Sequence, residues 1–195
     1  MSVKIFRKDD QITTNWSGGT TTQLYIYPEQ ASYAHRDFIF RISTAKVETP
    51  ESTFTLLPNI SRELMILDGE LKIVHEGHHT KILQKFDTDS FSGNWNTKGF
   101  GVVTDLNLMT TEKAKGNLIY RKLNAGDVVT PAFLVNQHYI AYYLLNGEAE
   151  LEYDGKKTTV NKHDFVIVSS ENLEESTVIN FHESSEIVET IISIF

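Results

Sequence analysis

The chain has 195 residues, of which 40% are apolar and 11% aromatic, so it can bury a packed core and is not disordered throughout. Its 18 basic and 26 acidic side chains give a net charge of -8, which disfavours partnership with nucleic acid or an anionic membrane. It has no cysteine, which excludes a disulfide framework, a thiolate metal site and a thiol nucleophile.

The beginning of the chain has no character of a targeting segment. Residues 1–10 carry scattered charges and no apolar stretch of the kind a secretory leader needs. No apolar run approaches the roughly 20 residues of a membrane helix. We therefore expect a cytoplasmic protein.

The dominant hydrophobic periodicity is two residues, which is typical of strands that bury one face. In chain order, strands are predicted at Val3–Phe6, Gln23–Tyr27, Asp37–Thr44, Glu63–Leu67, Glu70–His75, Gly101–Thr104, Leu118–Arg121, Tyr139–Leu145, Glu148–Tyr153, Phe165–Val168, Thr177–Phe181 and Ile187–Ile194. One helical turn is predicted around Thr110–Lys115. Many short strands at close spacing indicate a sandwich or barrel.

Two stretches of the chain are similar to each other. Residues 64–70 (LMILDGE) resemble residues 142–148 (YYLLNGE), at an offset of about 78 residues. Both stretches then meet the same turn residues at matching intervals: Gly69, Gly77 and Asp87 in the first copy, and Gly147, Gly155 and Asp164 in the second. Glycine suits the positive φ of tight hairpins, and aspartate suits turns through its bond to a nearby backbone N–H.

This repeat predicts an all-β fold, a bicupin in which two cupin-type jelly-roll barrels are fused in one body. The N-terminal barrel is expected over residues 1–115 and should hold the ligand cup. The C-terminal barrel is expected over residues 116–195, with some strand exchange between the two.

Five short blocks of the first half carry a more specific resemblance. In chain order they are Asn15–Thr22 (NWSGGTTT), Phe40–Ala45 (FRISTA), Ser61–Leu64 (SREL) followed by Gly69, Phe91–Gly93 (FSG) and Thr104–Met109 (TDLNLM). Together they resemble the HutD/Ves family of bicupins, which is associated with histidine utilisation. The resemblance implies the bicupin fold and a link to histidine catabolism.

The cupin resemblance raises the question of a metal site. Typical cupins bind a divalent ion through a His-x-His pair, a glutamate seven residues before the turn glycine, and a later histidine. Here the glutamate position holds Arg62 in the first copy and Ile140 in the second, and neither copy has His-x-His. A guanidinium has no acceptor and repels a metal ion. We therefore expect no metal and no other cofactor, and we interpret the first cup as built for an anion.

Three of the seven histidines cluster in the sequence. His75, His78 and His79 flank the turn Glu76–Gly77, so we interpret them as the solvated tip of a hairpin. The alternative is an adventitious metal site.

Two arginines are the sharpest candidates for binding a ligand. Arg62 and Arg41 each offer a planar fork of donors that matches a carboxylate. If their strands line the cup, they would create a positive field inside an acidic protein. The alternative is that each pairs with a buried carboxylate such as Asp105 and ties strands together.

Further candidates lie near the arginines. The segment Trp16–Thr21 could form a lip in which Trp16, Thr20 and Thr21 contact the ligand, or a tight loop with Trp16 as a core plug. Asp105 and Asn107 share a face of one strand and could bind the nitrogen end of a ligand, or hold a structural network.

We expect a non-catalytic protein that binds a small anionic metabolite in its N-terminal cup. By the family resemblance, that metabolite is an intermediate of histidine breakdown of the urocanate or formiminoglutamate type, and binding senses or limits the pathway. One alternative is an enzyme, an isomerase or hydrolase acting on a small acid. The other is a structural or partner-binding β-protein, with a homodimer formed through the aromatic residues 139–143.

Overall fold

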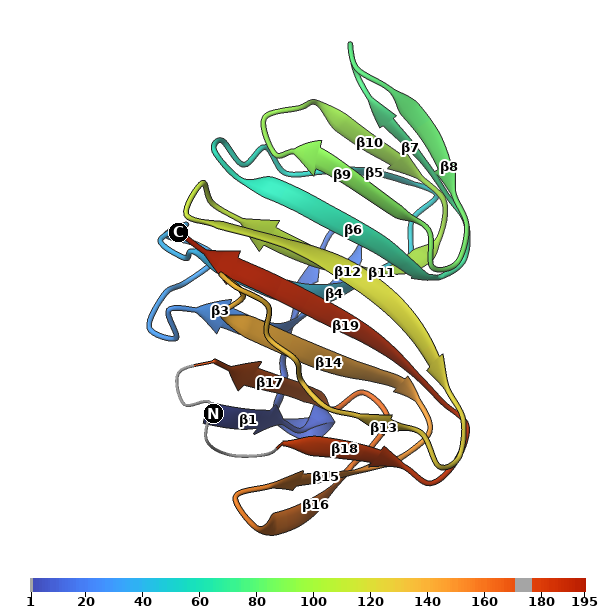
Figure 1. Ribbon diagram of the computed structural model, residues 1–195. Helices are drawn as coiled ribbons and strands as arrows, with labels where there is room; N and C mark the ends of the chain where they lie inside the picture. The colour runs from blue at the N-terminus through green and yellow to red at the C-terminus, as the bar shows by residue number, and fades with distance from the viewer. Residues whose placement is uncertain (1, 171–176) are drawn as a thin grey trace. The chain divides into compact units, whose positions relative to one another are not determined.

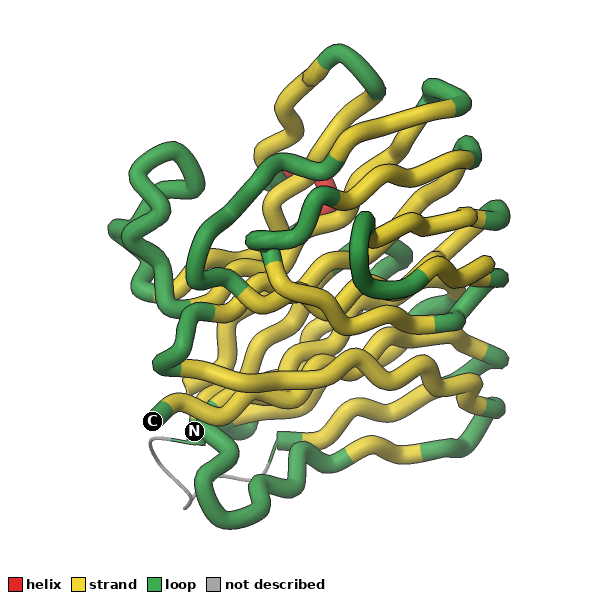
Figure 2. Tube along the Cα trace, turned by 90° about the horizontal axis from the view of Figure 1, so that it is seen from above, coloured by secondary structure: helices red, strands yellow, loops and turns green. Residues whose placement is uncertain are grey.

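The computed structural model describes residues 2–170 and 177–195, which form two compact units. The N-terminal unit is Ile12–Lys115, and the C-terminal unit combines the first eleven residues with Gly116–Phe195. Within the described residues there are nineteen strands and one 3-10 turn, η1 (Lys8–Asp10), joined by loops (Figure 2). The all-β prediction is therefore confirmed. None of the described residues belongs to a helix long and apolar enough to cross a membrane.

The N-terminal unit contains two antiparallel sheets (Figure 1). The six-stranded sheet has the order β2 (Ile12–Trp16), β3 (Gly19–Tyr27), β4 (Phe40–Val47), β11 (Val103–Thr110), β6 (Ser61–Asp68), β9 (Thr88–Ser92). The four-stranded sheet has the order β5 (Glu51–Thr53), β10 (Thr97–Phe100), β7 (Leu71–His75), β8 (Thr80–Leu83). Non-sequential neighbours in both sheets are the mark of a jelly roll rather than a meander.

The C-terminal unit repeats this two-sheet plan. Its five-stranded sheet has the order β1 (Ser2–Phe6), β17 (Phe165–Ser169), β14 (Tyr139–Asn146), β19 (Ser185–Ile194), β12 (Ala114–Leu123). Its four-stranded sheet has the order β13 (Val128–Val129), β18 (Val178–Phe181), β15 (Ala149–Tyr153), β16 (Lys156–Val160). The division differs from the predicted 1–115 boundary in the first eleven residues, because β1 pairs with β17 of the C-terminal unit.

Two local expectations about secondary structure need correction. The helical turn predicted at Thr110–Lys115 is wrong: β11 continues to Thr110, and Ala114 N donates to Thr111 O at 3.1 Å in a tight turn before β12. The sequence pattern also missed polar strands such as β2, whose residues are all exposed. An exposed edge strand lacks the apolar alternation on which such a prediction depends.

The turn glycines show that the sequence repeat is also a repeat of backbone conformation. Their φ angles are +85° at Gly69, +76° at Gly77, +87° at Gly147 and +67° at Gly155. The two aspartates also behave alike, because Asp87 and Asp164 each accept a bond from the backbone N–H three residues earlier, at 2.9 and 3.0 Å. Their interpretation as turn residues is confirmed.

The interiors of the two units differ. A continuous apolar cluster that includes Ile140, Tyr142, Leu144 and Val168 fills the C-terminal unit. In the N-terminal unit, the equivalents of Ile140 and Tyr142 under the repeat are Arg62 and Leu64. The cup position that is apolar in one unit therefore carries a charge in the other.

The paired glycines yield a first prediction about stability. A Cβ added at Gly69 would lie 2.5 Å from the Val102 carbonyl oxygen, whereas at Gly77 it would meet nothing within 4 Å. Both substitutions by alanine place a side chain at positive φ, which costs about 1–2 kcal/mol. We expect Gly69→Ala to lower the free energy of unfolding by this amount plus the cost of the clash, and Gly77→Ala by this amount alone.

Urea unfolding of both variants measures the difference, and Gly147→Ala with Gly155→Ala provides the same comparison in the second copy. Gly147 is also crowded, with Ser185 Oγ 2.2 Å from an added Cβ, and Gly155 is open. Equal losses within a pair would contradict the proposed role of close packing at these turns.

Candidate functional site

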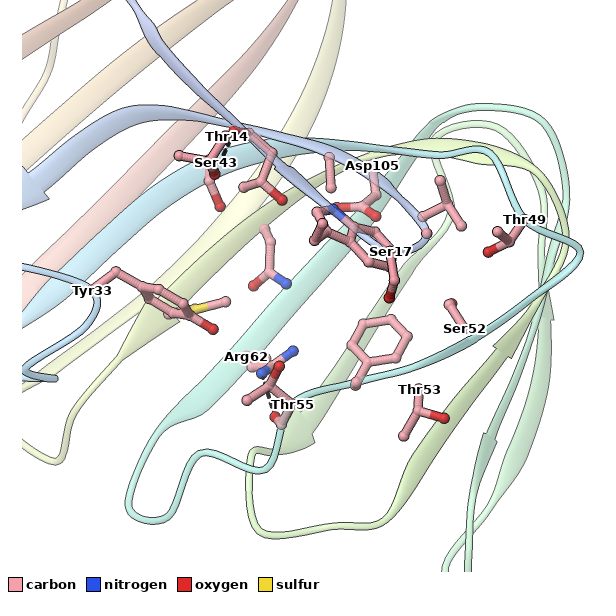
Figure 3. A pocket seen from close by; sticks show the side chains of 18 of the residues that line it. Thr14, Ser17, Tyr33, Ser43, Thr49, Ser52, Thr53, Thr55, Arg62 and Asp105 are labelled. Atoms are coloured by element: carbon pink, nitrogen blue, oxygen red, sulfur yellow. Dashed lines mark hydrogen bonds between the residues drawn. The ribbon is translucent and has the colours of Figure 1, made fainter.

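The N-terminal unit contains a cavity of about 610 Å³. One wall is the inner face of the six-stranded sheet, and another is the segment 49–55 around β5 (Figure 3). A cavity of this size matches the range of small-ligand sites.

The strand register explains which side chains reach the cavity. Across β6, β11 and β4, Arg62 pairs with Met109 and Met109 with Arg41. One step along the same face, Asn107 pairs with Ser43, and one step further Asp105 pairs with Ala45. Because side chains alternate between faces, the odd positions 105, 107 and 109 of β11 all line the cavity.

The structure brings together six of the seven residues predicted to contact a ligand: Trp16, Thr21, Arg41, Arg62, Asp105 and Asn107 line one cavity. Thr20 does not line it. It pairs with Lys46, whereas Thr21 pairs with the cavity residue Ala45. The two threonines point to opposite faces of β3, so the inclusion of Thr20 in the lining is corrected.

The segment Trp16–Thr21 is a strand hairpin rather than a free loop, because β2 ends at Trp16 and β3 starts at Gly19. The Trp16 ring folds back over Gly18, where an added Cβ would lie 2.1 Å from the indole. Trp16 is 39% exposed and lies on the cavity lining, so the alternative of a core plug is wrong.

Arg41 is buried and held by neutral groups. Its Nε donates to Gln23 Oε1 at 2.9 Å and its Nη1 to Ser43 Oγ at 3.0 Å. Its guanidinium carbon lies 4.5 Å from the centre of the Tyr33 ring. Burial lowers the pKa of Arg41, and the neighbouring charge of Arg62 lowers it further.

Arg62 is also buried, and its guanidinium is only partly satisfied (Figure 3). Its Nη2 donates to the carbonyl oxygen of Thr55 at 2.8 Å, while the buried Nε–H has no hydrogen-bond acceptor among the described residues. The guanidinium carbon lies 5.5 Å from the Phe54 ring centre and 5.7 Å from that of Phe91. Most buried N–H donors in proteins are paired with a protein acceptor or with ordered water.

Neither arginine forms the predicted alternative ion pair. Within the described residues, 2–170 and 177–195, the arginines that lie within 4.0 Å of a carboxylate are Arg7 and Arg121. Asp105 acts on Arg62 only as a more distant charge. The interpretation of these arginines as strand ties through a buried carboxylate is therefore wrong.

Asp105 and Asn107 complete the polar part of the cavity. Burial raises the pKa of the Asp105 carboxyl to about 7, although Arg62 opposes this. The buried Oδ1 of Asn107 has no donor among the described residues. Asn107 Oδ1 and Arg62 Nε are therefore both buried and both without a hydrogen-bond partner among the described residues.

Three contacts of this site were missed by reasoning from the sequence: Tyr33, Phe54 and Thr55. They lie outside the strands, on segments whose patterns carry no periodic signal. Each contacts an arginine seven or eight residues further along the chain, so the path of the loop and not strand alternation brings it there.

A divalent metal of the cupin type does not fit this cavity. The position of the expected glutamate ligand is Arg62, no histidine lines the cavity, and two guanidinium groups face it. Such a donor set repels a cation.

The predicted solvated tip at His75, His78 and His79 is wrong for His75. That side chain is fully buried and its Nε2 lies 2.8 Å from Asp89 Oδ2. His79 is partly exposed and reaches the same carboxylate, whereas His78 stacks on Trp95 with ring centres 3.8 Å apart.

A comparison with known proteins identifies the family of the chain. The HutD family model matches residues 8–188. A conserved protein of unknown function from Pseudomonas aeruginosa PAO1 has a similar structure, with a TM-score of 0.83, 15% identity, and coverage of 99% of this chain and 100% of that one. No curated protein matches the chain in sequence.

Two further structures are similar over nearly the whole chain. HutD from Pseudomonas fluorescens SBW25, determined in a formate condition, has a TM-score of 0.69 and 15% identity, with 97% of this chain and 98% of that one covered. The nickel(II) complex of the pirin YhhW from Escherichia coli has a TM-score of 0.70 and 7% identity, with 100% of both chains covered. The fold is therefore of the bicupin type.

The raised pKa of Asp105 yields a second prediction. Ionising this carboxyl in the folded protein is unfavourable between its ordinary pKa of 3.8 and about 7. The native protein should therefore lose stability as the pH rises through that window, by on the order of 4 kcal/mol. Asp105→Asn removes the ionisable group, so the variant should be more stable than the native chain at about pH 8, by a margin that shrinks toward about pH 4.

Asp164 serves as a control because its pKa is shifted in the opposite direction to that of Asp105. Although burial opposes it, donation from Asn161 N, Arg7 and Lys8 N lowers the pKa of Asp164. Asp164→Asn should therefore reduce stability at neutral pH. Urea unfolding across the pH range compares both variants, and a margin for Asp105→Asn that does not vary with pH would contradict the assignment.

Proposed function

The chain belongs to the HutD family, and we propose that it binds a small carboxylate metabolite in the cavity of its N-terminal unit. In this proposal Arg41 and Arg62 hold the carboxylate, Asp105 and Asn107 contact the nitrogen end, and Trp16 covers the ligand. Binding occurs without catalysis and serves to sense or limit histidine breakdown. The candidate ligands are acids of the urocanate or formiminoglutamate type.

The observation that carries the proposal is the pair of buried guanidinium groups without an acidic partner within 4.0 Å in the described part of the chain. A buried charge without a counter-ion costs several kcal/mol. A bound carboxylate would supply that counter-ion and accept from the free Nε of Arg62.

The unpaired oxygen of Asn107 indicates the chemistry of the other end of the ligand. Asn107 Oδ1 requires a donor, and Asp105 lies on the same face of β11. An imidazole or formimino N–H would satisfy Asn107, whereas a simple fatty acid would leave it unpaired. This supports a ligand with a carboxylate at one end and nitrogen at the other.

The relatives offer limited support for the ligand class. HutD from Pseudomonas fluorescens was determined in a formate condition, and formate is the smallest carboxylate. The family's association with histidine utilisation motivates the choice of urocanate and formiminoglutamate.

One observation favours a second candidate function. A carboxyl with a pKa of about 7 inside a small-ligand cavity suits a general acid or base. Under this alternative the protein is an isomerase or hydrolase acting on a small acid, with Asp105 transferring the proton. Incubation of each candidate ligand with the protein, followed by proton NMR, separates the two, since catalysis produces the signals of a new compound and binding alone does not.

The ligand proposal yields a third prediction, tested on chelator-treated protein. Isothermal titration should detect binding of urocanate or formiminoglutamate to the native chain, and Arg62→Met should weaken it by about 2–5 kcal/mol, because the carboxylate loses a buried partner. The matched control is Arg121→Met in the C-terminal unit, where the arginine is half-exposed and paired with Glu189, and this variant should bind normally.

Thermal unfolding distinguishes this role from a structural one. Removal of an uncompensated buried charge should not lower the melting temperature of the empty Arg62→Met protein, while the rise on adding ligand should disappear. A variant that melts lower but binds normally would remove Arg62 from the ligand site. A native chain that binds neither acid would contradict the histidine link.

A further inference from the structure

Three potential metal ligands meet outside the ligand cavity, at the end of β7, just before β8 and within β9. They are His75, His79 and Asp89, and their ligand atoms all lie within 4.8 Å of one another. Nε2 of His75 lies 2.8 Å from Asp89 Oδ2, and Nε2 of His79 lies 3.1 Å from the same oxygen. The two imidazoles and the carboxylate thus converge on one point.

The β7–β8 hairpin creates this convergence. The backbone N–H of His75 donates to the His79 carbonyl oxygen at 2.8 Å, and that of His78 donates to the His75 carbonyl oxygen at 3.0 Å. Gly77, with φ of +76°, allows the chain to reverse between them. The hairpin is therefore closed by backbone bonds and presents His75 and His79 as facing residues.

The buried imidazole is fixed before any ligand arrives. Nδ1 of His75 lies 2.8 Å from the Thr97 hydroxyl, and the ring packs 4.5 Å from the Phe91 ring. A partner on the far nitrogen is how proteins orient histidines that bind metal.

A protein cation already contacts the other oxygen of the Asp89 carboxylate. The Lys81 ammonium contacts Asp89 Oδ1, so the carboxylate accepts from two histidines and a lysine. The Lys81 side chain is 47% exposed and can turn into solvent, whereas Asp89 is fully buried. The site is thus arranged around a positive charge that is exchangeable.

We propose that His75, His79 and Asp89 bind a divalent transition-metal ion, which displaces the Lys81 ammonium. Two imidazoles with one carboxylate suit Zn²⁺, Co²⁺ or Ni²⁺ and do not suit Mg²⁺ or Ca²⁺. His79 is one-third exposed, so water can complete the coordination from the solvent side. The bound ion would fasten the β7–β8 hairpin to β9.

The neighbouring histidine supplies a matched control. His78 lies in the same hairpin but stacks on Trp95 and belongs to no ligand set among the described residues. Trp95 also lies edge-on to His75 and His79, with ring centres 5.4 and 5.8 Å away. Its fluorescence is therefore a local reporter of the site.

The test uses the full chain, freed of any affinity tag and treated with chelator, and titrates it with Zn²⁺ by calorimetry. We expect one ion per chain and no response to Mg²⁺. His79→Ala should weaken Zn²⁺ binding by at least the tenfold to hundredfold typical of losing an orienting partner. His78→Ala should bind as the native chain does, and Lys81→Met should bind more tightly because the competing cation is gone.

Co²⁺ provides a second readout, since its visible absorption changes when imidazole and carboxylate replace water. The change should appear in the native chain and in His78→Ala and be lost in His79→Ala, with Trp95 fluorescence following the same order. Native binding that survives His79→Ala would overturn the proposal. So would binding by Lys81→Met alone, because the natural lysine would then keep the ion out.

Discussion

Two positive charges buried in a β-barrel, with no carboxylate of the described residues within ion-pair distance, are the constraint on which the cavity depends. Arg41 is held by Gln23, Ser43 and the Tyr33 ring, and Arg62 by one carbonyl and two aromatic rings. Neutral partners of this kind position a guanidinium without neutralising it. The wall that they form repels a cation and attracts an anion, which separates this cup from metal-binding cupins.

The repeat shows how one backbone supports two different interiors. The turn glycines share their positive φ in both copies, so the strand order and reversals are conserved between the units. At the equivalent cup position, Arg62 in one unit corresponds to Ile140 in the other, which belongs to a continuous apolar cluster. The same backbone plan therefore carries an apolar side chain at this position in one unit and a charged side chain in the other.

Phe91 of β9 contacts one residue of the cavity and one residue of the proposed metal site. Its ring lies 5.7 Å from the Arg62 guanidinium and 4.5 Å from the His75 ring. Because protein interiors transmit small displacements through close packing, an ion that fastens β7 and β8 to β9 would also stiffen the contact between Phe91 and Arg62. In the two proposals, β9 therefore lies next to an anion site and a cation site with opposite charge requirements.

Local features of the sequence determined much of this protein. Alternation with a period of two placed Asp105 and Asn107 on one face and Arg41 with Ser43 on another strand's inner face, and the glycine spacing revealed the repeat. The prediction for Thr20 did not apply this rule. Thr20 was predicted to contact the ligand together with Thr21, although adjacent residues of a strand point to opposite faces.

Only the tertiary structure decided the rest. The pairing of β1 with β17, and the hydrogen bonds of buried His75 to Asp89 of β9 and Thr97 of β10, join residues that belong to separate strands. Such contacts depend on long-range strand pairing, so no window of the sequence contains their cause. A local pattern could therefore identify a charged cup but could not show which groups surround its charges.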